Sequence, residues 1–389
     1  MNERIYICHT FYHAYVTCLK EYHLRHGAMR SAGMPETTDP LSPEVTAIAG
    51  AATLVLSKMS NRFGTLADRA RGCGLFENVV EFDEQPETAF PELEPLKRDT
   101  GSLVKNLLNR IRFCRRLGQL EEPFVPVDLT KYGDVYVFCD SDPIGYYLNY
   151  KKIRYHAVED GLNCIEHFDA ARFDNRGHFD LKAKVASTGL IFIQNGWSRY
   201  CIDMEVNDIS RLEYPCPKYV ELPRDGLVSE LTQEDKDVLL KLFVENMEEL
   251  DRQLSEGKDR PRVLILSEPL CDLETRARIF RDLVAQYGSV DGTPAVVMIK
   301  QHPRDLLDYK TVFAPEEGVI LLSGSFPMEM LNFIRDLSFD RVVSVYTVVD
   351  SLHFVKEKVF LSHDFMDRYE DPSVHRKNEQ IRGRKHKWK

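Results

Sequence analysis

The most restrictive feature of the sequence is a short apolar run that ends in charged and ring-containing side chains. Residues 295–299 are all apolar and mostly β-branched, and Lys300, His302 and Pro303 follow them closely. A short run of this kind, stopped by proline, predicts a buried strand of a parallel sheet. Open α/β sheets bind their ligands at the carboxyl ends of such strands. Lys300 and His302 are therefore candidate ligand-binding residues, and an ordinary loop histidine beside a proline is the alternative.

Similar runs alternate with helical patterns along the whole chain. We predict strands at residues 5–8, 53–57, 77–82, 134–139, 153–158, 190–193, 218–222, 262–266, 295–302, 319–322 and 341–345. Helical patterns cover residues 101–117, 232–254, 274–287 and 327–337. Repeated βαβ order of this kind predicts an α/β protein with two Rossmann-like domains.

Length and composition agree with two soluble globular domains. A chain of 389 residues exceeds what one core usually supports, and we expect domains at residues 1–257 and 258–374, followed by a basic tail at 375–389. The net charge of -10 argues against general nucleic-acid binding. Without a membrane-length apolar run or a signal peptide, we expect a cytoplasmic protein. The nine scattered cysteines form no C-x-x-C pair and indicate neither zinc nor disulfides.

Polar residues follow the first predicted strand, where a helix begins. His9 and Thr10 lie where free backbone N–H groups and side chains could hold an acceptor substrate, and a helix cap is the alternative for Thr10. His13, His23 and His26 lie farther along this helix. No acidic or thiol partner completes a metal-ligand spacing there, so we expect these three histidines at the surface.

Acidic residues follow two other strands of the first half. Asp140 and Asp142 form a D-x-D pattern, which either holds a divalent cation against a nucleotide diphosphate or caps the helix that begins at Pro143. Glu159 and Asp160 precede a glycine that allows a sharp turn, so at least one carboxylate is expected to reach a cleft. Such a carboxylate could accept a proton from a sugar hydroxyl, although a solvated turn is the alternative.

The chain lacks both G-x-G-x-x-G and G-x-x-x-x-G-K-S/T, which argues against a dehydrogenase or a P-loop enzyme. Instead, E-D-G, K-x-H-P and F-P-x-E-x-L occur in that order, followed by a hydroxyl-bearing loop at a strand end. This order resembles the bacterial sialyltransferases, most closely glycosyltransferase family 52, with the bacterial polysialyltransferases as relatives. The resemblance implies the GT-B fold, in which two Rossmann-like domains with parallel sheets face each other across a cleft.

The resemblance also implies roles for individual residues. Glu159 is expected to be the general base with Asp160 in support, and His302 is expected to bind the phosphate of CMP and to donate a proton to it. Pro303 would pack near the nucleotide and Lys300 would lie close to the cytidine.

Two further parts of the donor site follow from the same resemblance. Glu329 is expected to accept hydrogen bonds from the ribose hydroxyls. The family pattern has paired hydroxyl residues at the phosphate, whereas this chain has Tyr346 and Thr347, with Ser344 nearby. Thr347 is the preferred phosphate contact, with Ser344 as the second residue.

The implied function is an inverting sialyltransferase that transfers sialic acid from CMP-sialic acid to a glycan or glycolipid, in bacterial lipooligosaccharide or capsule biosynthesis. A monophosphate leaving group needs no metal, so we expect no metal and no cofactor. The alternatives are a metal-dependent glycosyltransferase that uses another nucleotide sugar and a non-catalytic binding protein. The basic tail at 375–389 suggests peripheral contact with the inner face of the cytoplasmic membrane, or serves only solubility. A homodimer is one of the oligomeric states left open.

Overall fold

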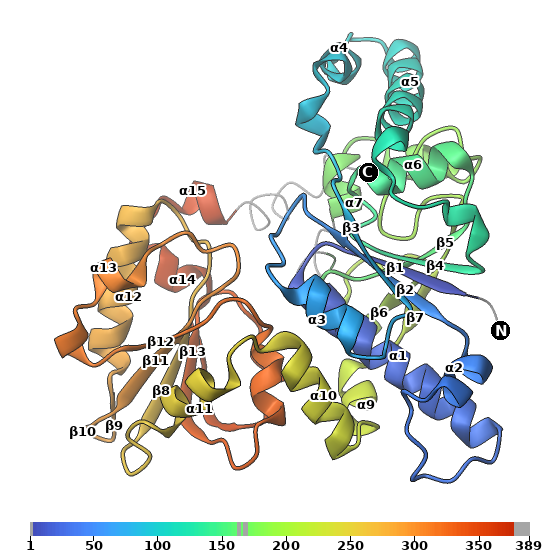
Figure 1. The fold of residues 1–389 in the computed structure, drawn as a ribbon. Helices are drawn as coiled ribbons and strands as arrows, with labels where there is room; N and C mark the ends of the chain where they lie inside the picture. Colours follow the sequence, from blue (N-terminus) through green and yellow to red (C-terminus); the bar gives the residue numbers. More distant parts are fainter. Residues whose placement is uncertain (1–2, 162–164, 166–169, 377–389) are drawn as a thin grey trace. The chain divides into compact units, whose positions relative to one another are not determined.

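The computed structural model describes residues 3–161, 165 and 170–376, which divide into two compact units (Figure 1). The first unit extends to Thr232 and the second begins at Gln233. We expected the boundary farther along, after residue 257. The helical segment before residue 257 belongs instead to the second unit.

The first unit is built on a seven-stranded, all-parallel sheet with the order β3-β2-β1-β4-β5-β6-β7. Its strands are β1 (Arg4–Cys8), β2 (Ala52–Ser57), β3 (Asn78–Phe82), β4 (Asp134–Phe138), β5 (Tyr155–Val158), β6 (Cys201–Val206) and β7 (Tyr219–Glu221). The direction of strand order reverses between β1 and β4. Ligand sites of doubly wound sheets lie at the carboxyl ends of the strands at such a switch point.

The helices of the first unit connect these strands. They are α1 (Phe11–Ser31), α2 (Pro43–Ala49), α3 (Leu66–Gly72), α4 (Glu94–Lys97), α5 (Leu103–Glu121), α6 (Pro143–Lys151), α7 (Ala170–Asp174), α8 (Phe179–Ala186) and α9 (Arg224–Ser229). Short 3-10 turns are η1 (Glu87–Ala89), η2 (Pro91–Leu93), η3 (Glu122–Phe124), η4 (Leu129–Lys131) and η6 (Ile209–Arg211).

The second unit repeats this plan with five parallel strands in the order β12-β11-β8-β13-β14. The strands are β8 (Arg262–Leu266), β11 (Val296–Lys300), β12 (Ile320–Leu322), β13 (Phe339–Ser344) and β14 (Val355–Phe360), beside a small hairpin of β9 (Ser289–Val290) and β10 (Thr293–Pro294). Its switch point lies between β8 and β13.

The helices of the second unit are α10 (Gln233–Phe243), α11 (Met247–Ser255), α12 (Leu273–Tyr287), α13 (Tyr309–Val312), α14 (Ser362–Met366) and α15 (Pro372–His375), with the 3-10 turns η7 (Pro315–Glu317) and η8 (Met328–Phe333). α10 packs against η8 and α11 against β12. These contacts explain why the second unit begins at Gln233.

Burial of the central strands confirms the parallel α/β class. Every residue of β1, β8 and β11 is buried, because helices or loops cover both faces of a parallel sheet. The first core surrounds β1, β4 and β5, and the second surrounds β8, β11 and β13. In the part of the chain described here, no helix has the length and apolar character to cross a membrane.

Some predicted elements were wrong. Residues 190–193 form no strand; Ile191, Phe192 and Ile193 are fully buried in a side-chain cluster with α5 and α6 instead. The missed strand β6 carries Asp203 and Glu205 between its apolar residues, so it lacks a continuous apolar run.

Differences also occur in the second unit. The helix expected at 232–254 is two helices, because Asn246 caps α11 by accepting a hydrogen bond from the backbone of Glu249. The helix expected at 327–337 is the shorter 3-10 turn η8. The missed strand β14 is an edge strand with mainly exposed, charged side chains.

Candidate active site

The carboxyl ends of β1, β4 and β5 bring together side chains that are far apart in the sequence. His13, in the first turn of α1, bonds through Nε2 to Oδ1 of Asp160, which is 147 positions later. The His13 ring also stacks on Phe138 at 4.4 Å between ring centroids. His13 is fully buried, so the expectation of a surface position was wrong. Its acidic partner comes from another strand end and leaves no local spacing signal.

A second hydrogen bond fixes the tautomer of His13. The backbone N–H of His9 donates to Nδ1 of His13 at 3.0 Å, so Nδ1 carries no proton. The neutral ring then has its proton on Nε2, which donates to Asp160. Burial raises the pKa of Asp160, but His13 and a hydrogen bond from Cys139 outweigh burial and hold this pKa below its usual value. Asp160 is therefore ionised at neutral pH.

Glu159 and Asp160 occupy different environments although they are adjacent. Glu159 is 1% exposed, and its Oε2 accepts the backbone N–H of Asn207 at 2.8 Å. Burial raises the pKa of Glu159. The Asp160 side chain is 35% exposed. Asp160 is thus the carboxylate of this pair that a substrate hydroxyl can reach.

Support for this strand end comes from a buried pair that sequence inspection missed. Nε2 of His9 bonds to Oε2 of Glu84 at 2.7 Å, and Glu84 also accepts from Ser57 Oγ (2.6 Å) and from the backbone of Ile144 (3.0 Å). Burial lowers the pKa of His9, but Glu84 outweighs burial and raises it to about 9. His9 is 1% exposed, so its ring braces the loop and does not face an acceptor substrate.

Thr10 takes the alternative role considered for it. Its hydroxyl caps α1 by accepting the backbone N–H of His13 at 3.1 Å. His23 is half-exposed and pairs with Glu230 at 2.9 Å. Neither residue presents an unoccupied polar group at the strand ends.

The D-x-D pattern does not present a pair of carboxylates to a cation. Both oxygens of Asp140 are used inside the unit: Oδ1 accepts the backbone N–H of Asn195 and Oδ2 accepts the Tyr155 hydroxyl, each at 2.9 Å. Burial raises the pKa of Asp140 to about 6. Asp142 occupies the N-cap position of α6 and lies 3.4 Å from Nε2 of His9.

One group of potential metal ligands does occur among the described residues. Ligand atoms of His9, His13 and Cys139 lie within 4.8 Å of one another. A ligating imidazole nitrogen must offer a lone pair, but the hydrogen bond to Nδ1 of His13 places the proton on Nε2, the nitrogen that faces Cys139. The hydrogen bonds that orient His13 toward Asp160 therefore leave this histidine poorly suited to bind a metal ion.

In the second unit, His302 lies just beyond the end of β11. Its backbone N–H donates to Ser267 Oγ at 3.0 Å, and its Nδ1 accepts the backbone N–H of Arg304 at 3.1 Å. These bonds place the ring proton on Nε2, for which no protein partner is seen in the described part of the chain. Burial, followed by the charges of Arg304 and Lys300, lowers the pKa of His302 to about 4.

Lys300 is buried beside this histidine, and the half-buried Glu329 lies near Lys300. Nζ of Lys300 donates to the carbonyl oxygen of Phe326 at 2.9 Å and lies 4.1 Å from the centre of that ring. Burial lowers the pKa of Lys300 to about 7, although Glu329 opposes this shift. Burial raises the pKa of Glu329. Pro303 is exposed next to them. The structure thus gathers Lys300, His302 and Pro303 at one strand end, with Glu329 near Lys300.

The loop after β13 has a different arrangement from the one expected. The carboxylate of Glu268 accepts the backbone N–H groups of Val345, Tyr346 and Thr347, each at 3.0 Å. Burial raises the pKa of Glu268, and these hydrogen bonds oppose the rise.

Both hydroxyl groups that were predicted to contact phosphate form hydrogen bonds within the protein. The Ser344 hydroxyl is buried and donates to the carbonyl oxygen of Thr347 at 2.8 Å. The Thr347 side chain bonds to Glu268. The two hydroxyls thus stabilise the loop, and a phosphate contact would require Thr347 to release Glu268.

A buried network missed by sequence inspection holds the loop of His302. Asp305 accepts from Arg276 Nη1 (2.6 Å), Ser267 Oγ (2.5 Å) and the Tyr309 hydroxyl (2.7 Å). Ser267 in turn accepts from the backbone of His302. Ser267 follows β8 directly, and its position at a strand end was the available signal.

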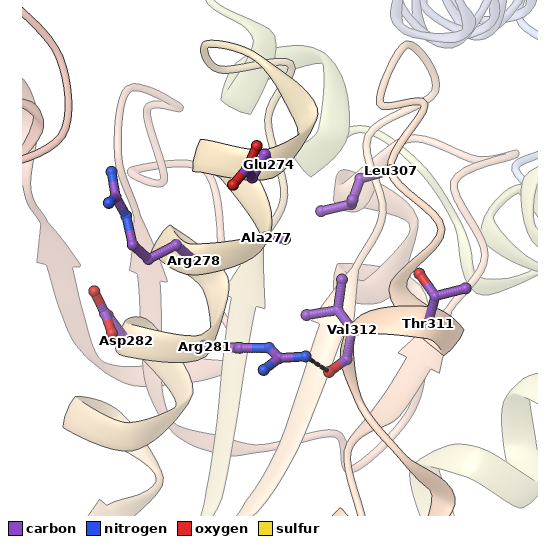
Figure 2. A pocket seen from close by; sticks show the side chains of 8 residues that line it. All are labelled: Glu274, Ala277, Arg278, Arg281, Asp282, Leu307, Thr311 and Val312. Atoms are coloured by element: carbon purple, nitrogen blue, oxygen red, sulfur yellow. Dashed lines mark hydrogen bonds between the residues drawn. The ribbon is translucent and has the colours of Figure 1, made fainter.

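An open recess of about 400 Å³ lies elsewhere on the second unit, between α12 and the segment that ends in α13 (Figure 2). Arg281 crosses it and donates to the carbonyl oxygen of Val312 at 3.0 Å. Its wall carries Glu274 and Asp282 as well as Arg278 and Arg281, and it contains none of the predicted site residues. The recess is therefore separate from the predicted donor site. The basic tail, apart from His375 and Arg376, lies outside the described residues.

Comparison with solved structures shows the fold. An α/β-galactoside α-2,3-sialyltransferase from Photobacterium phosphoreum superposes with a TM-score of 0.50 and 13% identity, over 92% of this chain and 90% of that chain. A 2,6-sialyltransferase from Photobacterium sp. JT-ISH-224, solved with CMP and lactose, gives a TM-score of 0.52 and 10% identity, over 92% and 71%. These likenesses confirm the predicted GT-B fold.

Sequence comparison identifies the family. None of the curated proteins matches the chain. The model of glycosyltransferase family 52 matches residues 114–359, more than half of the sequence, and this range includes the E-D-G, K-x-H-P and F-P-x-E-x-L motifs. The chain belongs to glycosyltransferase family 52.

Proposed function

We propose that this glycosyltransferase is a sialyltransferase that uses CMP-sialic acid as its donor. The observation that carries the proposal is the group at the end of β11, where Nε2 of His302 has no partner among the described residues, Lys300 is buried beside it and the half-buried Glu329 lies near Lys300. A neutral imidazole N–H suits a phosphate oxygen, and a carboxylate suits the vicinal hydroxyls of ribose. One of the structurally similar sialyltransferases was solved with CMP and lactose, which supports a nucleotide donor and a glycan acceptor.

The proposed reaction begins at Asp160. This ionised carboxylate takes the proton of an acceptor hydroxyl while the hydroxyl oxygen attacks the anomeric carbon of the donor. We assign this role to Asp160 because Glu159 is buried. Glu159 then supports the loop through its bond to Asn207.

The leaving group is handled by His302. As the bond between the anomeric carbon and the phosphate oxygen breaks, CMP leaves with the electron pair, and the Nε2–H group of His302 donates to the phosphate, where charge accumulates. A single displacement of this kind inverts the anomeric centre. A monophosphate leaving group with this donor needs no metal ion and no cofactor.

The finer parts of the function are proposals of the same kind. The acceptor is a bacterial surface glycan or glycolipid, such as a lipooligosaccharide or capsule precursor, and the enzyme acts on the cytoplasmic side of the membrane. We also propose that residues 375–389 attach the enzyme peripherally to the membrane and that the enzyme is a homodimer.

A donor screen tests the proposal. Purified enzyme is incubated with CMP-sialic acid, UDP-sugars or GDP-sugars and a lactose-terminated acceptor, and nucleotide release is measured with and without EDTA. We expect release from CMP-sialic acid alone, unaffected by EDTA. Release from a UDP- or GDP-sugar that EDTA abolishes would support the metal-dependent alternative. Absence of turnover and of donor hydrolysis, despite tight nucleotide binding, would support a non-catalytic binding protein.

A further inference from the structure

Helix α5 carries an apolar face that its own unit covers only along the second half of the helix. In that half, Phe113, Cys114 and Leu117 are buried in a cluster with residues of α6. The two helices approach closely at Gly118, where a Cβ atom would lie 2.6 Å from the carbonyl oxygen of Tyr146. The second half of α5 is therefore firmly anchored in the first unit.

The first half of α5 extends past this anchor, beside α4 at the edge of the first unit (Figure 1). Leu103 and Val104 are 71% and 69% exposed, and Leu107 and Leu108 are 38% and 47% exposed. Leu103, Leu107 and Cys114 follow helical spacing, so the exposed leucines continue the face that is buried farther along. Four adjacent aliphatic side chains in solvent form a patch that usually marks an interaction site.

The charged residues of this helix before its last residue, the buried Glu121, have one sign. Residues 100–120 contain five lysines and arginines and no acidic residue, on a chain whose net charge is -10. Lys105, Arg112 and Arg115 are exposed, and among the described residues none of them forms an ion pair. At 100° per residue Lys105 and Arg112 lie along one border of the leucine face, and Arg115 lies in line with Leu108, two turns farther along the helix. The chemistry of the surface is therefore aliphatic with a cationic border.

We propose that the first half of α5 docks on the surface of a membrane that contains anionic lipid. An aliphatic face enters the boundary between headgroups and acyl chains without needing a complementary protein shape, and the lysine and arginine border meets lipid phosphates. A helix that lies in the plane of the membrane does not need an apolar stretch long enough to span it. The proposal is independent of the basic tail and of the identity of the donor sugar.

The test is co-sedimentation of the full chain with vesicles of phosphatidylcholine alone or with an equal share of phosphatidylglycerol. We expect binding to the anionic vesicles, and the double variant Leu103→Ser/Leu107→Ser should lower apparent affinity about tenfold or more. The matched control is Leu306→Ser, which changes a leucine of the second unit that is 83% exposed. The control should bind like the wild type.

The cationic border is tested separately. Arg112→Gln/Arg115→Gln should weaken binding to anionic vesicles and reduce its salt dependence, with Lys258→Gln as the matched control. Repeating the leucine pair in a chain that ends at residue 376 removes any contribution of the tail. Thermal unfolding and turnover on a soluble acceptor should be unchanged in all these variants.

Two results would overturn the proposal. One is undiminished vesicle binding by the leucine variant in the chain that ends at residue 376, compared with the same shortened chain without the substitutions. The other is a wild-type dimer that this variant converts to a monomer without any change in lipid binding, since the apolar face would then cover a second copy of the chain.

Discussion

The carboxyl ends of the two sheets share a topology but differ in how their charges are compensated. In the first unit, His13 faces Asp160 and His9 faces Glu84, so each buried ring has a carboxylate partner. At the end of β11 in the second unit, no carboxylate of the described residues is hydrogen-bonded to the His302 ring, whose pKa is lowered to about 4. The first arrangement keeps a carboxylate ionised, as the proposed base must be, and the second leaves a ring N–H group that an anionic ligand would satisfy.

Asp160→Asn is expected to have the largest effect and tests the first side of this comparison. Turnover should fall by about 10²–10⁴-fold, because the amide cannot accept the proton of the acceptor hydroxyl. Asn can still accept the hydrogen bond from His13, so folding and CMP affinity should be retained. Initial rates with saturating donor and acceptor provide the measurement.

Glu159→Gln is the matched control. A glutamine oxygen can still accept the backbone N–H of Asn207, so we expect less than about a tenfold loss of turnover. An inactive Glu159→Gln together with an active Asp160→Asn would assign the base to Glu159 and reverse our reading of the two carboxylates.

His302→Ala tests the proposed ligand site at the end of β11 in the second unit. Loss of a hydrogen bond to phosphate should weaken CMP binding by about 1.5–3 kcal/mol, and turnover should fall further because charge on the leaving group grows in the transition state. Calorimetric titration of CMP provides the affinity, and His353→Ala is the control for an exposed histidine of the same unit. Wild-type CMP affinity in His302→Ala would place the donor site elsewhere.

The lowered pKa of His302 predicts a pH-dependent effect on CMP binding that a simple loss of packing would not produce. Below pH 6.5 an ordinary histidine gains a proton, whereas His302 stays neutral down to about pH 4. A bound phosphate favours the protonated ring and therefore raises this pKa. Between these two pH values CMP binding should be accompanied by proton uptake in the wild type, seen as a buffer-dependent heat, and His302→Ala should lack this uptake.

Glu329→Gln should have the smallest effect and sharpens the assignment within the second unit. CMP affinity should fall about tenfold, because a neutral amide replaces a charged acceptor for the ribose hydroxyls, while affinity for inorganic phosphate should not change. Glu316→Gln provides an exposed control. Equal losses for CMP and phosphate would mean that Glu329 acts through the phosphate region and does not contact ribose.

The fold could be predicted because its central strands are buried on both faces and therefore appear as continuous apolar runs. The same rule failed for β6 and β14, where charged side chains interrupt the run, and for residues 190–193, which are buried without pairing in a sheet. Motif order was enough to identify the candidate residues of the second unit, since Lys300, His302 and Pro303 are close in the sequence.

The first unit shows where prediction from local patterns ends. The pairing of His13 with Asp160 and that of His9 with Glu84 join separate strand ends, and no spacing in the sequence indicates them. Local pattern also could not decide which of Glu159 and Asp160 is buried, because both follow the same strand. That difference depends on Asn207, which lies beyond β6.

The hydrogen bonds of Glu268 have a consequence for the speed of donor binding. Its carboxylate fixes the backbone at Val345, Tyr346 and Thr347 through contacts within the protein alone. A ligand that contacts this segment would lose little affinity to ordering its backbone, and its association would not wait for the segment to fold. Glu268 thus preorganises the backbone of this loop, although the Thr347 side chain would still have to exchange partners to contact a phosphate.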